Sequence, residues 1–342
     1  MLDAAEFFRR AAVWDAVASA GGYPPFLQSD FMAACLREFG TGHEVLAILG
    51  DDSSPEAMAL LANKLPGVWQ TFVPSQLPLG AFVRRRPGPI EGILENLLTA
   101  LPGTAAMVSV AQQDPAIIPR PAETPLLVTL DYIDTARVTI EGAFEEFWAA
   151  RGKNLRHNIK RQRAKLADDG VVVRVDVVDE AEGVAAAMAE YGRLESAGWK
   201  ATGGTAIAPN NAQGRFYTSM LEAFCTTGGG RIYRCLFDDK VVAMDLGIER
   251  DGVLVVLKTT YDEALKAISP ASLMRHEYFQ RLFEAQGVTR LEFYGKVMEW
   301  HLRWTGDVRM LYHINYYRSP WIKTTHELLR RKGENKAAES TS

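Results

Sequence analysis

The chain has 342 residues, of which 47% are hydrophobic, 23% charged and 10% aromatic. This composition is typical of a soluble globular protein of about two domains, and it excludes a disordered chain, a coiled coil and a collagen-like fibre. No stretch approaches the ~20 consecutive apolar residues of a membrane span, and the N-terminus lacks a signal-peptide pattern. Three cysteines are too few for a disulfide framework or a zinc site, so we expect a cytoplasmic protein without a metal.

Charge is distributed unevenly along the chain. Residues 1–150 contain 9 Lys and Arg against 18 Asp and Glu, whereas residues 151–342 contain 29 against 24. The first half is therefore acidic and the second mildly basic. An anionic ligand is expected to bind the second half.

The first half is predicted to alternate helices with strands. Periodic apolar residues predict helices over residues 30–39 and 88–101, and short apolar runs predict strands over 44–49, 105–110 and 126–130.

An irregular segment over residues 74–87 carries three consecutive arginines, Arg84, Arg85 and Arg86, within the acidic half. Proline and glycine punctuate it, as in a loop. It is either a solvated loop or the lip of a ligand cleft, and the sequence leaves both interpretations open.

A basic amphipathic helix is predicted directly after residue 150. Residues 151–165 contain seven Lys and Arg and no acid, with Leu155 and Ile159 on one helical face and Arg156 and Lys160 on another. The basic face is a solvated surface, a nucleic-acid contact or a phosphate-facing cleft wall. Nucleic acid is disfavoured because no aromatic residues alternate with the basic ones and the whole chain is acidic. Arg156 and Lys160 are candidate substrate contacts.

The second half is predicted to contain helices, then an antiparallel meander, then a helix and a strand, which is an α+β arrangement. The predicted elements are strand 171–178, helices 181–196 and 212–225, strands 231–237, 241–249 and 253–260, helix 272–286 and strand 289–294. No dinucleotide-binding glycine motif, phosphate loop, nucleophile elbow or zinc-protease motif occurs.

Two segments carry candidate chemistry. Trp199 and Lys200 lie in a glycine-rich loop after a predicted helix, where Trp199 either contacts substrate or fills the core. Farther along, a strand leads through Lys258, Tyr261 and Asp262 to Ser269-Pro270, which opens a helix. The free N–H groups and dipole of a helix N-terminus favour a phosphate there.

Three motifs resemble those of one enzyme family. R-G-K-N-L-R at 151–156, E-S-A-G-W-K at 195–200 and K-x-x-Y-D-E…S-P-A-x-L-M at 258–274 resemble the GNAT-type acetyltransferases of the CelD-like group, which are related to the Fem-type aminoacyl transferases. The resemblance covers about residues 145–320. The chain departs from the family in having Ala271 where glycine is usual, and it lacks the R/Q-x-x-G-x-G/A loop of ordinary GNAT enzymes.

The resemblance implies two tandem GNAT-like lobes, each a mixed, mostly antiparallel sheet flanked by helices. Residues 1–145 would form a supporting lobe and cleft wall, residues 146–330 would carry the acyl site, and residues 331–342 would be a disordered tail. It further implies acetyl-CoA as the acyl donor. The donor would be held by backbone N–H groups of four residues and the charge of Arg275; the four are Ser269, Ala271, Ser272 and Leu273.

The implied reaction is attack of an amine or hydroxyl on a thioester, which needs a base, an oxyanion donor and an acid. Glu195 is the first candidate for the base, with Glu292 and Glu299 as competitors.

The other roles follow from the same requirement and from the resemblance. Tyr261 is the candidate acid, and Asp262 would orient Lys258 or Tyr261. The family resemblance implies that Lys296 polarises the acyl carbonyl.

The acceptor is not determined by the sequence. The resemblance suggests a cell-envelope or exopolysaccharide precursor, and Trp300, in an aromatic tract, either stacks on a sugar or packs in the core. The alternatives are an aminoacyl-tRNA-dependent transferase on the same fold and a non-catalytic scaffold in polysaccharide synthesis.

Overall fold

The structure is a computed structural model that describes residues 1–197, 207–208 and 210–339. The first lobe begins with these elements in chain order: β1 (Leu2–Asp3), α1 (Glu6–Arg9), α2 (Ala11–Ala20), η1 (Pro25–Leu27), α3 (Ser29–Phe39), β2 (Val45–Gly50), β3 (Pro55–Leu65), β4 (Val68–Thr71), β5 (Phe82–Arg84), α4 (Glu91–Ala100), β6 (Met107–Gln113) and β7 (Leu127–Thr139).

The chain then continues into the second lobe. Its elements are α5 (Phe144–Ala149), α6 (Lys153–Asp168), β8 (Val173–Val178), α7 (Ala181–Ala197), α8 (Ala212–Thr226), β9 (Gly230–Phe237), β10 (Lys240–Arg250), β11 (Val253–Tyr261), η3 (Glu263–Ile268), α9 (Pro270–Ala285), β12 (Arg290–Glu292) and α10 (Glu299–Leu302). The last two elements are β13 (Asp307–Tyr317) and α11 (Pro320–Glu339).

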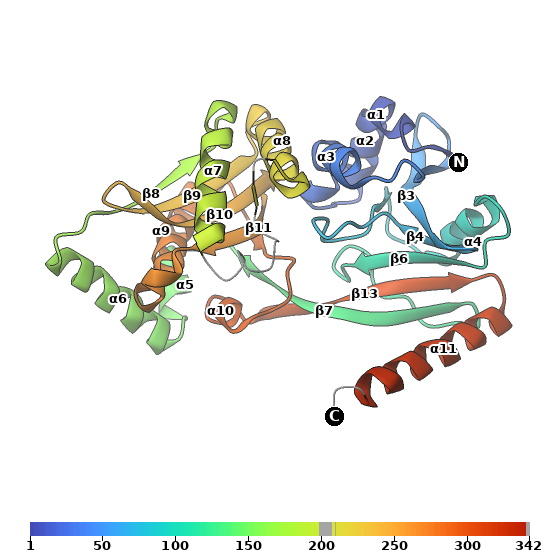
Figure 1. Ribbon diagram of the computed structural model, residues 1–342. Helices are drawn as coiled ribbons and strands as arrows, with labels where there is room; N and C mark the ends of the chain where they lie inside the picture. Colours follow the sequence, from blue (N-terminus) through green and yellow to red (C-terminus); the bar gives the residue numbers. More distant parts are fainter. Residues whose placement is uncertain (198–206, 209, 340–342) are drawn as a thin grey trace.

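One mixed sheet runs through both lobes (Figure 1). Its strands follow the order β1-β2-β3-β4-β6-β13-β7-β12-β11-β10-β9-β8, and β5 pairs with β3. Most neighbouring pairs are antiparallel, but β4 with β6 and β11 with β12 are parallel. The expected α+β class is therefore confirmed.

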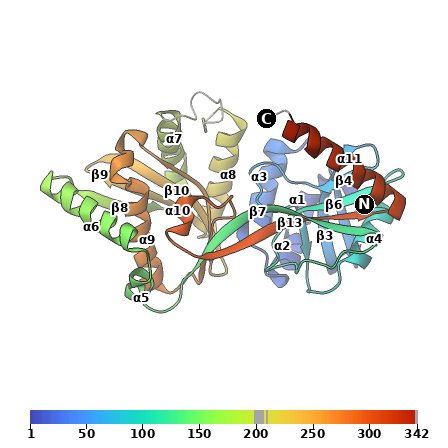
Figure 2. The same cartoon turned by 90° about the horizontal axis from the view of Figure 1, so that it is seen from below.

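The end of the chain returns to the first lobe. Ile314 on β13 pairs with Val110 on β6 and with Thr129 on β7, so β13 is inserted between two first-lobe strands. Figure 2 shows the long strands β7 and β13 running between the lobes, with α11 beside the first lobe. The predicted boundaries place this strand in the second lobe, and the predicted disordered tail from residue 331 is helical through Glu339.

Strand β10 is buried along most of its length because helices cover both faces of the second lobe's sheet. Met244, Leu246 and Ile248 pack in the core that includes α7 and α8. Val242 packs in the opposite core, which includes α9. A sheet covered on both faces explains why this strand reads as an almost continuous apolar run.

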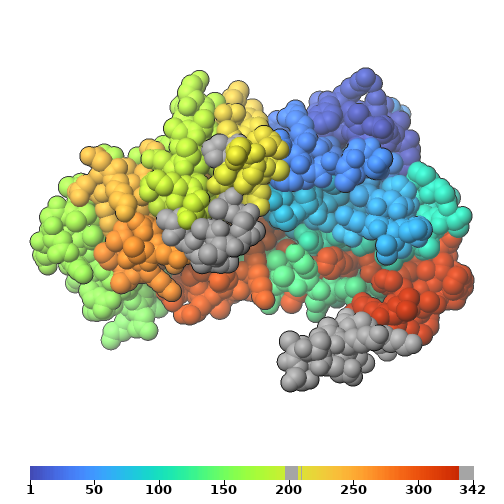
Figure 3. All heavy atoms as spheres, in the orientation of Figure 1, coloured from blue at the N-terminus to red at the C-terminus, as the bar shows by residue number. Residues whose placement is uncertain are grey.

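Helix α8 of the second lobe packs against α3 of the first, and Figure 3 shows these two regions in contact. The Phe216 ring lies edge-on to Phe31 with 5.2 Å between centroids, and Arg215 pairs with Glu38 at 2.8 Å. This contact and the shared strands fix the lobes relative to each other.

The helices predicted over 30–39, 88–101 and the basic segment correspond to α3, α4 and α6. Strand β13 and the hairpin of β3 and β4 were not predicted.

No helix in the described part of the chain combines the length and apolarity needed to cross a bilayer.

Candidate functional site

A cavity of about 350 Å³ opens where β11 ends and α9 begins; we call it the α9 cavity. Strand β11, the end of α7, helix α10 and the loop before α9 surround it. It brings together seven of the predicted site residues: Glu195, Tyr261, Ser269, Ala271, Ser272, Arg275 and Trp300.

The first turn of α9 is closed tightly. Ser269 adopts a left-handed conformation (φ 56°), which costs a non-glycine residue about 1 kcal/mol or more. Its carbonyl accepts the N–H groups of Ser272 (2.9 Å) and Leu273 (3.2 Å), and its own N–H donates to the Lys266 carbonyl (3.1 Å). Three of the four N–H groups predicted to hold the donor are thus engaged by the main chain. Among the described residues, the Ala271 N–H has no acceptor.

Lys258 on β11 and Glu195 on α7 form an ion pair beside the cavity. The Lys258 Nζ donates to Glu195 Oε1 at 3.1 Å, and the Glu195 side chain is completely buried. The other carboxylate oxygen accepts the Ile207 N–H at 2.8 Å. The Lys258 ammonium also lies 5.5 Å from the centre of the Tyr217 ring. A buried carboxylate needs such partners to remain charged.

Tyr261, at the end of β11, is half-buried and lines the cavity as predicted. Its neighbour Asp262 has a different role from the one predicted. Asp262 pairs with Lys240 at 2.7 Å and accepts the Ala264 N–H at 3.1 Å, which begins η3. The hydrogen bond from Lys240 lowers the pKa of the Asp262 carboxyl. Asp262 therefore holds the turn after β11 instead of orienting Lys258 or Tyr261.

Arg275 was expected to offer its charge to the donor, but that charge is already compensated. Its guanidinium is buried and forms two bonds of 2.9 Å to the Asp245 carboxylate. It also donates to the Thr259 hydroxyl at 2.6 Å and lies 4.0 Å from the centre of the Trp300 ring. Arg275 therefore positions two cavity-lining groups instead of presenting a free cation.

Several predicted residues lie outside the lining of the α9 cavity. Lys296 is exposed in the loop after β12, and Glu299 is exposed and paired with Arg303 at 2.7 Å. Glu292, the other competing base, is buried in an ion pair with Arg309 at 2.8 Å.

Arg156 and Lys160 are exposed on α6, away from the residues that line the cavity. Helix α6 contacts η3, the short helix before α9, through a hydrogen bond of 2.9 Å from the Gln162 side chain to the Ala267 carbonyl. Trp199 and Lys200 lie outside the described residues.

The structure also places two cations at the cavity that sequence reasoning missed, Lys266 and Arg303. Lys266 lies between Tyr261 and Ser269, two residues of the motif at 258–274, so the motif already indicated the loop that carries it. Arg303 follows α10 and reaches the cavity only through the fold, so no local pattern indicated it. Within the described part of the chain, no cluster of His, Cys, Asp and Glu is arranged to hold a metal ion.

Comparison with known protein families identifies a GNAT-like segment in the second lobe. Residues 153–302 match the acetyltransferase (GNAT) domain family, and this segment contains both β11 and α9. No curated protein sequence matches the chain significantly.

Solved structures resemble nearly the whole chain. FemX has a TM-score of 0.58 at 9% identity, covering 93% of this chain and 98% of its own. The C-terminal domain of a proposed lysylphosphatidylglycerol synthetase from Agrobacterium fabrum has a TM-score of 0.58 at 15% identity, covering 91% of both chains. A conserved protein of unknown function from Bacteroides thetaiotaomicron has a TM-score of 0.56 at 10% identity, and the match covers 92% of this chain and 97% of that protein. At these identities the likeness shows the fold alone. The chain has a GNAT-like fold, and its second lobe contains a segment similar to GNAT acetyltransferase domains.

Proposed function

We propose that the α9 cavity binds an acyl-CoA, with acetyl-CoA as the donor, and that the protein transfers the acyl group to an amine or hydroxyl. One observation carries the proposal: the cavity lies at the N-terminus of a 16-residue helix within the GNAT-like segment. A helix N-terminus attracts anions through its unpaired N–H groups and its dipole.

The residues of the cavity fit an elongated, phosphate-bearing thioester. The Ala271 N–H, the Ser272 side chain and the cation Lys266 suit phosphate groups. Arg303 also suits them, because its pair with Glu299 is exposed and therefore weak. The lining also contains Trp300 and the methyl-bearing side chains of Thr259 and Thr260, which suit a less polar arm. CoA supplies the activated thioester, and the protein supplies binding, orientation and proton transfer.

In the proposed reaction, the acceptor nitrogen or oxygen forms a bond to the acyl carbon and the carbon–sulfur bond breaks. The acceptor proton passes to Glu195, and the departing thiolate takes a proton from Tyr261. Lys258 acts as a positioning residue, because its ion pair keeps the buried Glu195 carboxylate charged. Both acid and base line the same cavity.

The acceptor is proposed from the resemblance to the CelD-like group: a precursor of cell-envelope or extracellular polysaccharide. The test is incubation with acetyl-CoA and a panel of amino sugars, neutral sugars, amino acids and polyamines. Free thiol and acylated product are both measured. Thiol release that depends on one acceptor class supports the proposal. Absence of both acetyl-CoA binding and thiol release would instead support the non-catalytic scaffold.

A second candidate, transfer from aminoacyl-tRNA, is favoured by the exposed basic face of α6, which carries Arg156 and Lys160. A face of this kind contacts phosphates whatever the nucleic-acid sequence. Activity with acetyl-CoA that survives ribonuclease treatment would exclude this candidate. Activity seen only with charged tRNA would establish it.

A further inference from the structure

A second cavity of about 350 Å³ lies between the lobes; we call it the inter-lobe cavity. The first lobe contributes the end of α2, the segment after β5 and the segment after β6, and β7 and β12 complete the walls. It shares no lining residue with the α9 cavity. Gly21 is required at its edge, because a Cβ there would lie 2.2 Å from the Arg84 carbonyl oxygen.

Two of the three consecutive arginines singled out in the sequence line this cavity, Arg84 and Arg86. Side chains alternate between the two sides of an extended chain, so the middle residue faces the other way. Arg85 instead donates to the Pro55 carbonyl at 2.8 Å. The arginine-rich segment is therefore a cavity wall instead of a solvated loop.

Arg84 is a buried cation, with its residue only 3% exposed. Its Nη1 donates to the Gly88 carbonyl at 2.7 Å, and no carboxylate of the described residues lies within 4.0 Å of its guanidinium. Burying a charge without a counterion is costly, so the site favours an anion beside Arg84. The exposed Arg86 likewise has no acidic partner in the described part of the chain.

Tyr23 provides a second buried polar group on the same cavity. The residue is 7% exposed, and its hydroxyl has no hydrogen-bond partner among the described residues. Burial raises the pKa of Tyr23, and the charge of Arg84 opposes that shift only in part, so the hydroxyl stays protonated. The cavity thus contains one buried donor without a partner, the Tyr23 hydroxyl, beside the buried charge of Arg84, and a bound anion would satisfy both.

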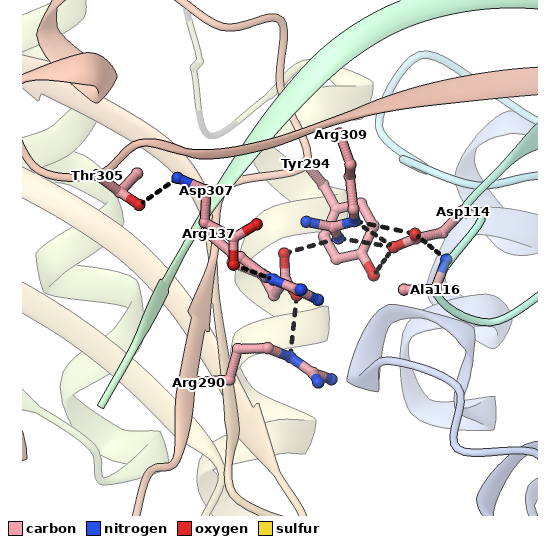
Figure 4. Close-up of polar contacts among 9 residues, drawn as sticks. Asp114, Ala116, Arg137, Arg290, Tyr294, Thr305, Asp307 and Arg309 are labelled. Atoms are coloured by element: carbon pink, nitrogen blue, oxygen red, sulfur yellow. Dashed lines mark hydrogen bonds and ion pairs between the residues drawn. The ribbon is translucent and has the colours of Figure 1, made fainter. Parts of the chain in front are cut away.

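The carboxylates of the cavity floor are occupied by other arginines. Arg309 from β13 pairs with Asp114 at 2.6 Å and with Glu292 at 2.8 Å, and the Tyr294 hydroxyl donates to Asp114 at 2.8 Å. Figure 4 shows Arg309 and Tyr294 both directed toward Asp114. Arg290 pairs with Glu292 at 2.9 Å. This network ties the lobes together and leaves the charges of Arg84 and Arg86 uncompensated.

We propose that the inter-lobe cavity binds a phosphate-type dianion, either inorganic phosphate or a phosphate monoester, through Arg84, Arg86 and the Tyr23 hydroxyl. Two guanidinium groups match the charge of a dianion, and the planar donors of arginine match phosphate oxygens. The cavity is large enough for a phosphate to carry a small organic group. The site is separate from the acyl-CoA site and does not depend on it.

The test is calorimetric titration of the full chain with inorganic phosphate, glucose 6-phosphate and acetate. We expect phosphate or the monoester to bind and acetate to bind at least about tenfold more weakly. Tyr23→Phe and Arg86→Gln should each weaken phosphate binding at least about fivefold, the usual size of one charge-assisted or buried hydrogen bond. Arg85→Gln, the matched control, should leave it unchanged. Tighter binding of glucose 6-phosphate than of phosphate would identify the ester as the ligand class.

The proposal is overturned if neither phosphate probe binds at millimolar concentration, or if acetate binds as tightly. Equal weakening by Arg85→Gln and Arg86→Gln would also overturn it, because the effect would then be general electrostatics. The same titrations are repeated with acetyl-CoA present. Unchanged phosphate affinity supports a separate site, and loss of phosphate binding contradicts it. Acetyl-CoA affinity in Arg86→Gln, expected to equal that of the wild type, keeps this test distinct from that of the proposed function.

Discussion

Lys258 and Glu195 come from different elements, β11 and α7, and form a 3.1 Å ion pair in which the carboxylate side chain is fully buried. Buried pairs of this kind contribute little net stability, yet removing one partner is costly because the remaining charge stays buried. The pair thus gives the α9 cavity a fixed anionic group whose role can be separated from folding.

The first prediction separates those roles. Lys258→Met should reduce the free energy of unfolding by about 3–5 kcal/mol, because it removes the cation next to the buried Glu195 carboxylate. The double variant Lys258→Met/Glu195→Gln should recover much of that loss, measured by urea denaturation. Its acyl-transfer rate should remain at least about 10²-fold below the wild-type rate, since the proposed base is gone. A stable double variant with wild-type turnover would exclude Glu195 as the base.

The second prediction concerns Tyr261, the proposed acid. Tyr261→Phe keeps the ring and removes only the hydroxyl, so stability should change little while kcat falls by about 10²-fold or more. The measurement is steady-state thiol release with an acceptor found in the panel. An increase in KM at unchanged kcat would show that Tyr261 only binds substrate.

The third prediction tests the role that the family resemblance implies for Lys296. Because Lys296 is exposed and does not line the α9 cavity, Lys296→Ala should lower kcat by less than about tenfold. Loss of an oxyanion donor costs about 10²–10³ in kcat. A decrease of that size would restore Lys296 to the mechanism and show that its loop reaches the cavity during turnover.

The fourth prediction is a pH dependence of stability. Burial, with a smaller effect of Arg163, lowers the pKa of His276 to about 4, and burial, with a smaller effect of Arg275, lowers that of His301 to about 4. Both pKa values lie below the unfolded value of about 6.5, so this stability is fully present above pH 6.5 and is lost as the pH falls toward 4.

Thermal denaturation between pH 7.5 and 5 checks this, because most carboxylates stay ionised over that range. The wild-type Tm should fall across it, and His276→Gln and His301→Gln should each flatten the curve. His301 has a structural reason for the effect, since its Nδ1 accepts the Met298 N–H at 2.9 Å and cannot do so once protonated. An unchanged slope in both variants would contradict the assignment to these histidines.

Much of the second lobe was predictable because local patterns determine it. The basic helix, the three-stranded meander and the Ser269-Pro270 helix start all appear where periodicity and turn residues placed them. Strand β13 was missed because its position between β6 and β7 comes from long-range pairing, for example of Ile314 with Val110 and Thr129.

The candidate site shows the same division between local and long-range information. Tyr261, Ala271 and Ser272 were placed at the cavity because one strand–loop–helix segment holds them. Arg275 was misassigned because its partner Asp245 lies 30 residues away on β10. Spacing along one helix cannot reveal an ion pair between that helix and a strand of the sheet. It also cannot reveal that Arg303 lines the same cavity.

The most direct test of the central claim is the affinity for acetyl-CoA of Ala271→Asp, measured by calorimetry beside Ala212→Asp as a matched control. Both substitutions place a carboxylate in the first turn of a helix, where it interacts favourably with the helix dipole, and the Tm of each variant is measured as the check on folding. Only Ala271→Asp places the charge in the α9 cavity. We predict that it weakens acetyl-CoA binding at least about tenfold, a change of about 1.4 kcal/mol, while Ala212→Asp binds like the wild type. Equal affinity in all three proteins, or no binding by the wild type, would contradict an acyl-CoA site at the start of α9.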